Sequence, residues 1–258
     1  MKLDIWVANP AGNITIFVKN EVMQENYLKI ANKLLEIEKY QAEQVAFAKN
    51  LAHEPFVMEM MGLEFCGNAT RSFGYLAAKE NNYQTPCKVV VDVSGSANNL
   101  EVMVDYAKQD AIVAMSAPKD IVDIKVNDQI FSMVIMEGIS HVIIKQKEFD
   151  EALSNNILSY VLANYEVDAL GLMFVDGSNM YPVVYVVQTD TLIHEGSCGS
   201  GSIAYAYYQF HNKDGEHTID IKQPGGTLTI KVVNNETKEC YLGGMISLSE
   251  LETVEIEL

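Results

Sequence analysis

Two short stretches of the chain share one motif, in which a cysteine is followed by glycine and other small residues. The first copy spans residues 66–70 (Cys-Gly-Asn-Ala-Thr) and the second spans residues 198–202 (Cys-Gly-Ser-Gly-Ser). The two cysteines are 132 residues apart (198 minus 66), which is close to half of the 258-residue chain. Each motif leads directly into an apolar segment with helical spacing, so the pattern predicts two helices that each begin with a cysteine.

A cysteine at the start of a helix is suited to acid–base chemistry. The free N–H groups of the first turn and the helix dipole favour negative charge, so we expect the pKa of Cys66 and Cys198 to fall. The small residues that follow would let a ligand approach the backbone closely. Four residues whose amides follow the cysteines are therefore expected to hold a substrate carboxylate: Gly67, Asn68, Gly199 and Ser200.

Two such helix starts, pointing at one another across one pocket, would invert an α-carbon. A thiolate on one side would remove the α-proton, and a thiol on the other side would deliver a proton to the opposite face. Amide donors would stabilise the developing enediolate, and exclusion of water would strengthen them. This chemistry requires neither a cofactor nor a metal ion in principle.

The alternative is that these cysteines are small buried residues without a chemical role, which is the usual state of a single cysteine at a helix start. Duplication of the motif in matching positions favours the catalytic interpretation. Cys87 and Cys240 lie in strand patterns without neighbouring glycines, and we interpret them as structural.

Composition excludes several classes of protein. The net charge of −17 disfavours binding to nucleic acid or to anionic membranes, because both need clustered Lys and Arg. No apolar run approaches the eighteen or so residues of a membrane span, and the N-terminus has no signal-peptide pattern. We therefore expect a cytoplasmic protein with reduced thiols, and the cysteine spacing predicts no zinc site.

The order of predicted elements repeats in the two halves, which indicates an internal duplication. We predict an α+β fold of two pseudo-symmetric domains, each a sheet or barrel wrapped around a central helix. The break at 116–118 places the N-terminal domain at residues 1–117 and the C-terminal domain at 118–246. The alternating tail, residues 247–258, is expected to return to the N-terminal domain as an added strand.

Five segments resemble the diaminopimelate epimerase-like superfamily, and within it the histidine racemases of staphylopine-type metallophore biosynthesis. They are residues 9–13, residues 64–70, Glu195, residues 197–201 and residues 223–226. The resemblance covers nearly the whole chain. It implies catalysis by two cysteines without a cofactor, an amino acid substrate and a homodimer. It also implies that Asn13, Gln44 and Glu195 hold the substrate, with Glu195 accepting hydrogen bonds from the α-ammonium group.

The chain departs from diaminopimelate epimerase itself where that enzyme grips the distal end of its substrate. Gly196 stands in place of an arginine, and Ile139 and Leu170 stand in place of asparagines. A site without partners for a buried charge rejects that charge, so a substrate with one amino acid head is favoured. His141 and His194 are candidates for bases, but a single histidine near a strand end is usually structural or exposed.

The resemblance favours inversion of L-histidine to D-histidine. Two alternatives stay open. One is a racemase or epimerase of another amino acid, including substrates of the diaminopimelate type. The other is an amino acid-binding module with inert cysteines, which would bind its ligand without exchange of the α-proton.

Overall fold

The computed structural model describes residues 1–257, and the chain folds into two compact units. Unit 1 comprises residues 1–114 together with the chain from Leu242 onward, and unit 2 comprises residues 115–241. The sequence had placed the corresponding boundaries after residue 117 and near residue 246. Within the described residues, no helix is long and apolar enough to cross a membrane.

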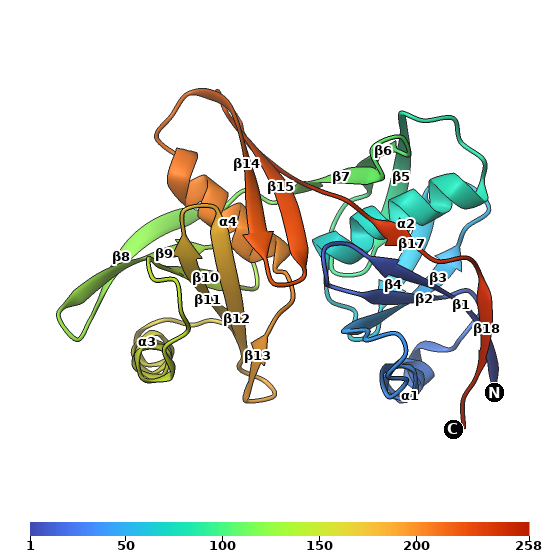
Figure 1. The fold of residues 1–258 in the computed structure, drawn as a ribbon, viewed down its shortest axis with the longest axis horizontal. Coiled ribbons are helices and arrows are strands. Elements are labelled where there is room, and N and C mark those ends of the chain that lie inside the picture. Colours follow the sequence, from blue (N-terminus) through green and yellow to red (C-terminus); the bar gives the residue numbers. More distant parts are fainter. Residues whose placement is uncertain (258) are drawn as a thin grey trace. The chain divides into compact units, whose positions relative to one another are not determined.

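Unit 1 is a mixed sheet with two α-helices (Figure 1). Its strands pair in the order β1, β2, β3, β4, β5, β6, β7, and β17 and β18 pair with the outer edge of β1. The elements are β1 (Lys2–Asn9), β2 (Thr15–Val18), η1 (Gln24–Asn26), α1 (Tyr27–Leu35), β3 (Gln44–Asn50), β4 (Phe56–Met60), α2 (Gly67–Glu80), β5 (Cys87–Val93), β6 (Leu100–Asp105), β7 (Asp110–Met115), β17 (Ser247–Leu248) and β18 (Glu252–Glu255).

Unit 2 is built in the same way. Its strands pair in the order β8, β9, β10, β11, β12, β14, β15, and β13 pairs with the second half of β12. The elements are β8 (Asp120–Val126), β9 (Gln129–Ile135), β10 (Ser140–Ile144), α3 (Glu151–Asn164), β11 (Ala169–Asp176), β12 (Asn179–Val186), β13 (Thr191–His194), α4 (Gly199–Phe210), β14 (Gly215–Gln223), β15 (Gly226–Asn234) and β16 (Lys238–Gly243), which ends in unit 1.

The two units share one sequence of strand directions, which is the structural form of the duplication. From β1 to β6 the successive pairs are antiparallel, parallel, antiparallel, parallel and antiparallel. From β9 to β15, leaving out β13, the same alternation occurs. In both units each parallel pair is connected through a helix, as a parallel connection requires. The predicted α+β class with two pseudo-symmetric halves is confirmed.

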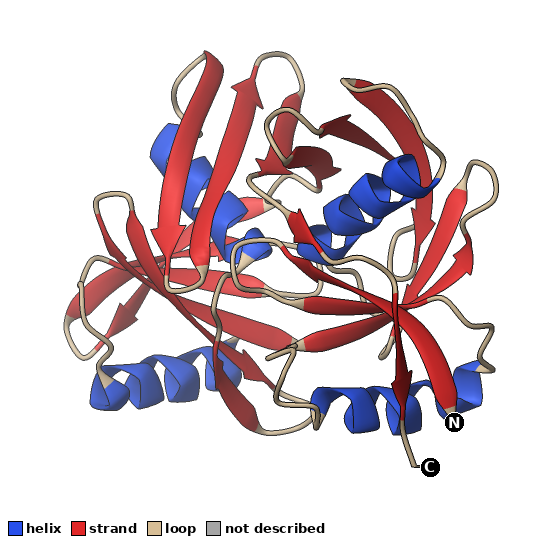
Figure 2. Cartoon of the chain, turned by 45° about the vertical axis from the view of Figure 1, so that its right-hand side comes forward, coloured by secondary structure: helices blue, strands red, loops and turns tan. Residues whose placement is uncertain are grey.

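The cysteine-led helices α2 and α4 are the central helices of their units. Every residue of α2 from Gly67 to Ala78 is buried, and α2 contacts β4, β5 and β6. Helix α4 is buried from Gly201 to Tyr207 and contacts β10, β11, β14 and β15. In each unit, the other helix lies on the opposite side of the strands (Figure 2).

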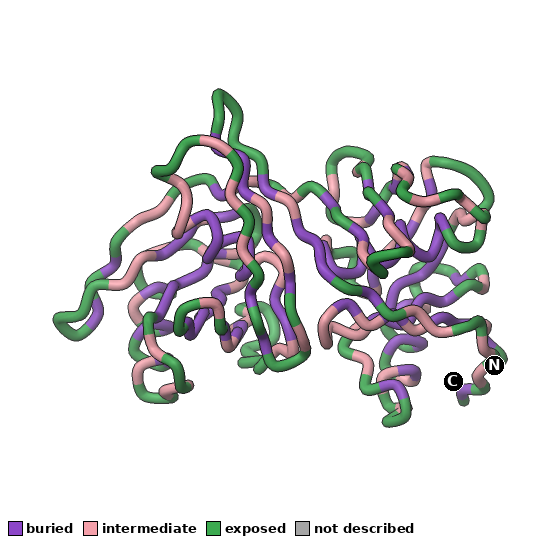
Figure 3. The backbone as a smooth tube through the Cα atoms, turned by 45° about the horizontal axis from the view of Figure 1, so that its top comes forward, coloured by how far each residue is buried: buried purple, intermediate pink, exposed green. Residues whose placement is uncertain are grey.

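The outer helices α1 and α3 are amphipathic and bury one face only. Helix α1 packs with β1, β2 and β3, and Ile256 from the returning C-terminal segment joins the same apolar cluster. Helix α3 packs with the strands from β8 to β12. Helix α1 is short, because the chain forms only the turn η1 before it and leaves the helix after Leu35. In both units burial follows the strands and exposure follows their connections (Figure 3).

Glycine at position 74 of α2 is required by a neighbouring strand. A Cβ atom added to Gly74 would lie 2.6 Å from Cβ of Val102 in β6. The matching position of α4, 132 residues further on, carries Ala206, which is fully buried. The neighbouring strands of unit 2 therefore leave room for a methyl group at this place.

We expect Gly74→Ala to destabilise the protein although alanine favours a helix. The propensity gain is about 1 kcal/mol, and overpacking of a close-packed core costs about 1–3 kcal/mol. Urea unfolding of Gly74→Ala, Val102→Gly and the double variant measures the coupling, because glycine removes the Val102 Cβ atom that the new methyl group would meet. A loss in the double variant smaller than the sum of the single losses supports the steric account, and additive losses contradict it.

Candidate active site

Cys66 is the N-cap residue of α2, so it lies between the preceding loop and the first turn of the helix. Its backbone is extended (φ −131°, ψ 112°), and its Sγ accepts a hydrogen bond from the backbone N–H of Ala69 at 3.5 Å. The carbonyl of Cys66 accepts from both the backbone N–H and the hydroxyl of Thr70, at 2.9 Å and 2.8 Å. The sulfur is therefore one of the groups that satisfy the free N–H donors of the helix start.

Polar side chains from two adjacent strands surround the Cys66 sulfur. The parallel register pairs Thr15 at the start of β2 with Gln44 at the start of β3. Nε2 of Gln44 lies 3.3 Å from Cys66 Sγ and 2.9 Å from both Asn13 Oδ1 and Thr15 Oγ1. Asn13 Oδ1 in turn lies 3.7 Å from Cys66 Sγ. The structure thus brings Asn13, Gln44 and Cys66 together in unit 1.

Cys198 holds the same position before α4 in unit 2. Its backbone is extended (φ −118°, ψ 112°), and Sγ accepts from the N–H of Gly201 at 3.4 Å. The hydroxyl of Ser202 donates to the Cys198 carbonyl at 2.6 Å. Gln223, at the end of β14, accepts from the Cys198 N–H at 2.8 Å and donates to Ser202 at 2.9 Å. Gln223 therefore fixes this helix start from the neighbouring strand.

Cys198 is more deeply buried than Cys66, and this reverses one expectation from the sequence. Burial raises the pKa of the Cys198 thiol well above its ordinary value, and the charge of Glu195 raises it further. Hydrogen bonds from Ser200 and from the Gly201 N–H act in the opposite direction, as expected at a helix start, but they do not outweigh burial. The prediction of a lowered pKa is wrong for Cys198.

The residues predicted to flank Cys198 lie beside it. Ser200 Oγ is 3.6 Å from Cys198 Sγ, and Glu195 interacts with the same thiol. Glu195, Gly199 and Ser200 are half-buried, so they are reachable from solvent. In unit 1, the corresponding Gly67 and Asn68 are buried.

The sequence named His141 as a candidate base but favoured a structural or exposed residue, and the structure places it beside Ser200. It lies in β10, is fully buried, and its Nε2 is 3.1 Å from Ser200 Oγ. Its Nδ1 has no hydrogen-bond partner among the described residues. Burial lowers the pKa of His141 to about 3, so the ring is neutral at pH 7. A neutral imidazole, a hydroxyl and the Cys198 thiol thus form a chain of contacts. The one indication that His141 is an interior residue is its strand, because every residue of β10 is buried.

Unit 2 has an apolar side chain at the register position that Gln44 occupies in unit 1. Leu170, fully buried, pairs with Ser140 at the place where Gln44 pairs with Thr15. The next residue is Gly171, where an added Cβ would lie 2.0 Å from Nδ1 of His141.

The remaining histidine and cysteine candidates lie outside these two clusters. His194 is exposed on β13, with Nδ1 3.2 Å from the Tyr181 hydroxyl and its ring against Phe149. Cys87 is half-buried in β5, and burial raises the pKa of Cys240 to about 12. Across residues 1–257, no group of three or more His, Cys, Asp or Glu side chains is arranged to hold a metal ion.

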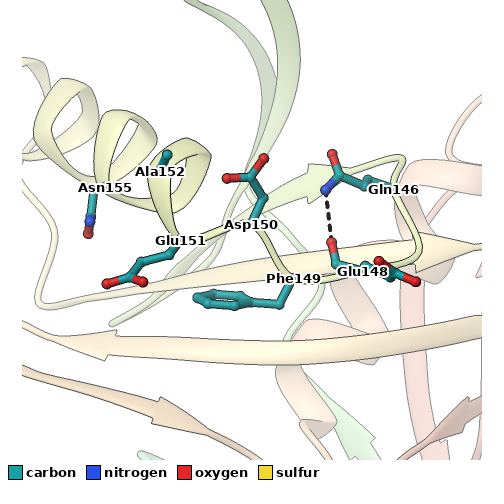
Figure 4. A pocket seen from close by; sticks show the side chains of 7 residues that line it. All are labelled: Gln146, Glu148, Phe149, Asp150, Glu151, Ala152 and Asn155. Carbon is teal, nitrogen blue, oxygen red and sulfur yellow. Dashed lines mark hydrogen bonds between the residues drawn. The ribbon is translucent and has the colours of Figure 1, made fainter.

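A hollow at the start of α3 is separate from the cysteine clusters (Figure 4). It is lined by Gln146, Glu148, Phe149, Asp150, Glu151, Ala152 and Asn155. Asp150 accepts from the N–H of Leu153 at 2.9 Å, and Gln146 donates to the Glu148 carbonyl at 2.9 Å. These contacts are those of a helix cap and a turn, and none of the predicted site residues lines the hollow.

Solved structures with this fold span the whole chain. A phenazine biosynthesis protein of the PhzF family from Bacillus anthracis aligns with a TM-score of 0.68 at 15% identity, covering 99% of this chain and 100% of that one. A hydroxyproline epimerase from Agrobacterium vitis aligns with a TM-score of 0.67 at 10% identity, covering 98% and 92%. The chain therefore shares the fold of these two proteins over nearly its whole length. Residues 2–250 match the family described as "Histidine racemase CntK N-terminal domain", and the chain belongs to this family.

Relatives with assigned activities support the same placement. A histidine racemase of Fusobacterium nucleatum is 35% identical over 263 residues, covering 95% of this chain and 94% of the relative. A histidine racemase of Staphylococcus aureus is 26% identical over 246 residues, covering 90% and 88%. The protein is an isomerase of the amino acid racemase class.

The neutral, buried state of His141 predicts a pH dependence of stability. Its folded pKa of about 3 lies below the ordinary value of 6.5, so the unfolded chain binds the proton more strongly. Stability is full above pH 6.5 and falls as the pH drops towards 3, by about 2 kcal/mol between pH 7 and pH 5.

Urea unfolding at these two pH values measures this loss in the wild type and in His141→Gln, which cannot take up the proton. We expect the difference between pH 7 and pH 5 to shrink by about 2 kcal/mol in His141→Gln. The exposed His194→Gln is the control and should behave as the wild type. Equal pH dependence of all three proteins would contradict a neutral buried His141.

Proposed function

We propose that the protein racemises L-histidine to D-histidine without a cofactor, by a two-base mechanism in which Cys66 and Cys198 act on one α-carbon. The observation that carries this proposal is the duplicated helix start, where each unit presents one thiol held by the N–H of the third residue of its helix. The substrate is assigned from the relatives in Fusobacterium nucleatum and Staphylococcus aureus, which are histidine racemases.

In this mechanism one cysteine enters as a thiolate and the other as a thiol. The thiolate takes the α-proton and becomes a thiol, while the other thiol gives its proton to the opposite face and becomes a thiolate. Protons and charge are balanced, and the reverse reaction uses the two sulfurs in exchanged roles. No metal ion or cofactor takes part in the proposed steps.

The intermediate is the costly species, because an α-proton beside an ionised carboxylate is very weakly acidic. We assign its stabilisation to the backbone amides that follow each cysteine: Gly67, Asn68, Gly199 and Ser200. An aligned donor at a developing oxyanion contributes about 3–4 kcal/mol in comparable enzymes, so several donors are needed.

Three side chains would orient the amino acid head of the substrate. Glu195 is assigned to accept hydrogen bonds from the α-ammonium group, and its half-buried position beside Cys198 supports this role. Asn13 and Gln44 are assigned to the Cys66 side, which their contacts with that sulfur support. We also propose a homodimer and a place in metallophore biosynthesis, both from the resemblance, and a cytoplasmic location, as expected in the sequence analysis.

The first test is exchange of the α-proton. L-Histidine incubated with the enzyme in D2O should incorporate one α-deuterium and lose its optical rotation, because both faces of the α-carbon are protonated by solvent-derived protons. Nuclear magnetic resonance and polarimetry measure the two quantities. If histidine keeps its α-proton and its optical rotation while diaminopimelate or another amino acid is turned over, the substrate is reassigned. Binding without any exchange would indicate a binding module.

The second test separates the two proposed bases from the other cysteines. Cys66→Ser and Cys198→Ser should each lower the racemisation rate by at least about a thousandfold, since a serine hydroxyl is a much weaker acid and base than a thiol. Cys87→Ser is the matched control and should retain activity, because Cys87 lies in a strand away from both clusters. Racemisation at the wild-type rate by either single variant would contradict the two-base mechanism.

A further inference from the structure

Arg71 is a fully buried cation on the same helix as Cys66, five residues further along. Its Nε donates to Asn68 Oδ1 at 3.1 Å, and its Nη1 donates to the carbonyl of Gly244 in the returning C-terminal segment. Its Nη2 has no hydrogen-bond partner among the described residues. A buried guanidinium is costly, so an arginine with an incomplete set of partners calls for an electrostatic explanation.

The charges near Arg71 are those of one carboxylate and one thiol. Burial lowers the pKa of Arg71 to about 10, while the negative charges of Asp110 and of Cys66 raise it, so the side chain stays charged at pH 7. Asp110, on β7, also accepts from the Gly244 N–H at 2.8 Å. The carboxylate of Glu43 also approaches the Cys66 cluster, where it accepts from Asn13 at 2.7 Å.

The duplicated motif supplies an internal comparison. In unit 2 the residue five positions after Cys198 is Ile203, which is fully buried. Cys198 therefore lacks a cation at the matching place, and the charged group beside it is the carboxylate of Glu195. The two thiols share one helix-start geometry, but a positive group accompanies the first and a negative group accompanies the second.

We propose that Arg71 is a positioning residue that holds Cys66 as the thiolate of the resting enzyme, so that Cys66 begins as the base and Cys198 begins as the acid. This rests on the proposed two-cysteine racemisation. The guanidinium acts through space on the sulfur and, through Asn68, on the orientation of the first turn of α2. After one inversion the thiolate resides at Cys198, beside Glu195, so the two protonation forms of the enzyme differ in energy.

Alkylation of the free enzyme tests the assignment without any substrate. The rate of iodoacetamide modification is followed against pH, and peptide mass spectrometry resolves Cys66 from Cys87, the other half-buried thiol of the same unit. Burial and the charge of Glu54 raise the pKa of Cys87, so Cys87 is followed as a separate peptide and not as the pH standard. In the wild type, the midpoint for Cys66 should lie below about 8.5, the ordinary pKa of a cysteine. A midpoint at or above about 8.5 would overturn the proposal, whether or not any variant folds.

Variants give the direction of the effect. Arg71→Gln should move the Cys66 midpoint up by at least about one pH unit, and Arg71→Lys should restore part of the shift. Asp110→Asn should move it down, because the guanidinium is then less neutralised. Lys79→Gln, which removes an exposed cation from the other end of α2, is the charge-matched control and should leave the midpoint unchanged.

An unchanged Cys66 midpoint in folded Arg71→Gln would show that Arg71 is only structural. Because no substrate is used, the alkylation result is independent of histidine turnover. If the exchange experiment with histidine fails while these shifts are observed, the proposed reaction is lost and the role of Arg71 at the thiol remains.

Discussion

The hydrogen bond from a helix N–H to a cysteine sulfur is the interaction on which both cysteine clusters depend. At Cys66 and Cys198 the sulfur takes the place of the Ser, Thr, Asp or Asn oxygen that usually satisfies the first turn. This capping fixes the sulfur at the N-terminus of the helix, beside the small residues of the first turn. The mixed sheets bury most of each helix, from Gly67 to Ala78 in α2 and from Gly201 to Tyr207 in α4.

Both units keep the cysteine-capped helix start, but different side chains surround the sulfur in each unit. Both units pair the same strands in the same directions, so the start of a parallel strand lies near each sulfur. In unit 1 that start carries Gln44, and in unit 2 it carries Leu170 with a buried histidine, His141, beside it. Two cysteine clusters with one backbone geometry and different polarity support the proposed reaction, in which one thiolate accepts a proton while the other thiol donates one.

The sequence was sufficient for the fold and for the elements that carry the cysteines, because both depend on local patterns. The helix starts follow from Cys-Gly steps before apolar periodic segments, and the pairing follows from repeated order. His141 and Arg71 could not be recognised in this way. Their importance comes from contacts with Ser200 and with Gly244, which lie 59 and 173 residues away along the chain, and no local spacing encodes such contacts. These contacts depend on how distant strands pair in the folded chain.

The same limit explains why the expected pKa of Cys198 was wrong. A helix start favours a thiolate through a few oriented N–H groups, and this effect can be read from the motif. Desolvation opposes the thiolate, and its size depends on how far the whole unit covers the sulfur. At Cys198 burial prevails and Glu195 adds to it. A thiol in this environment is better suited to begin as an acid than as a base, which is the role proposed for Cys198.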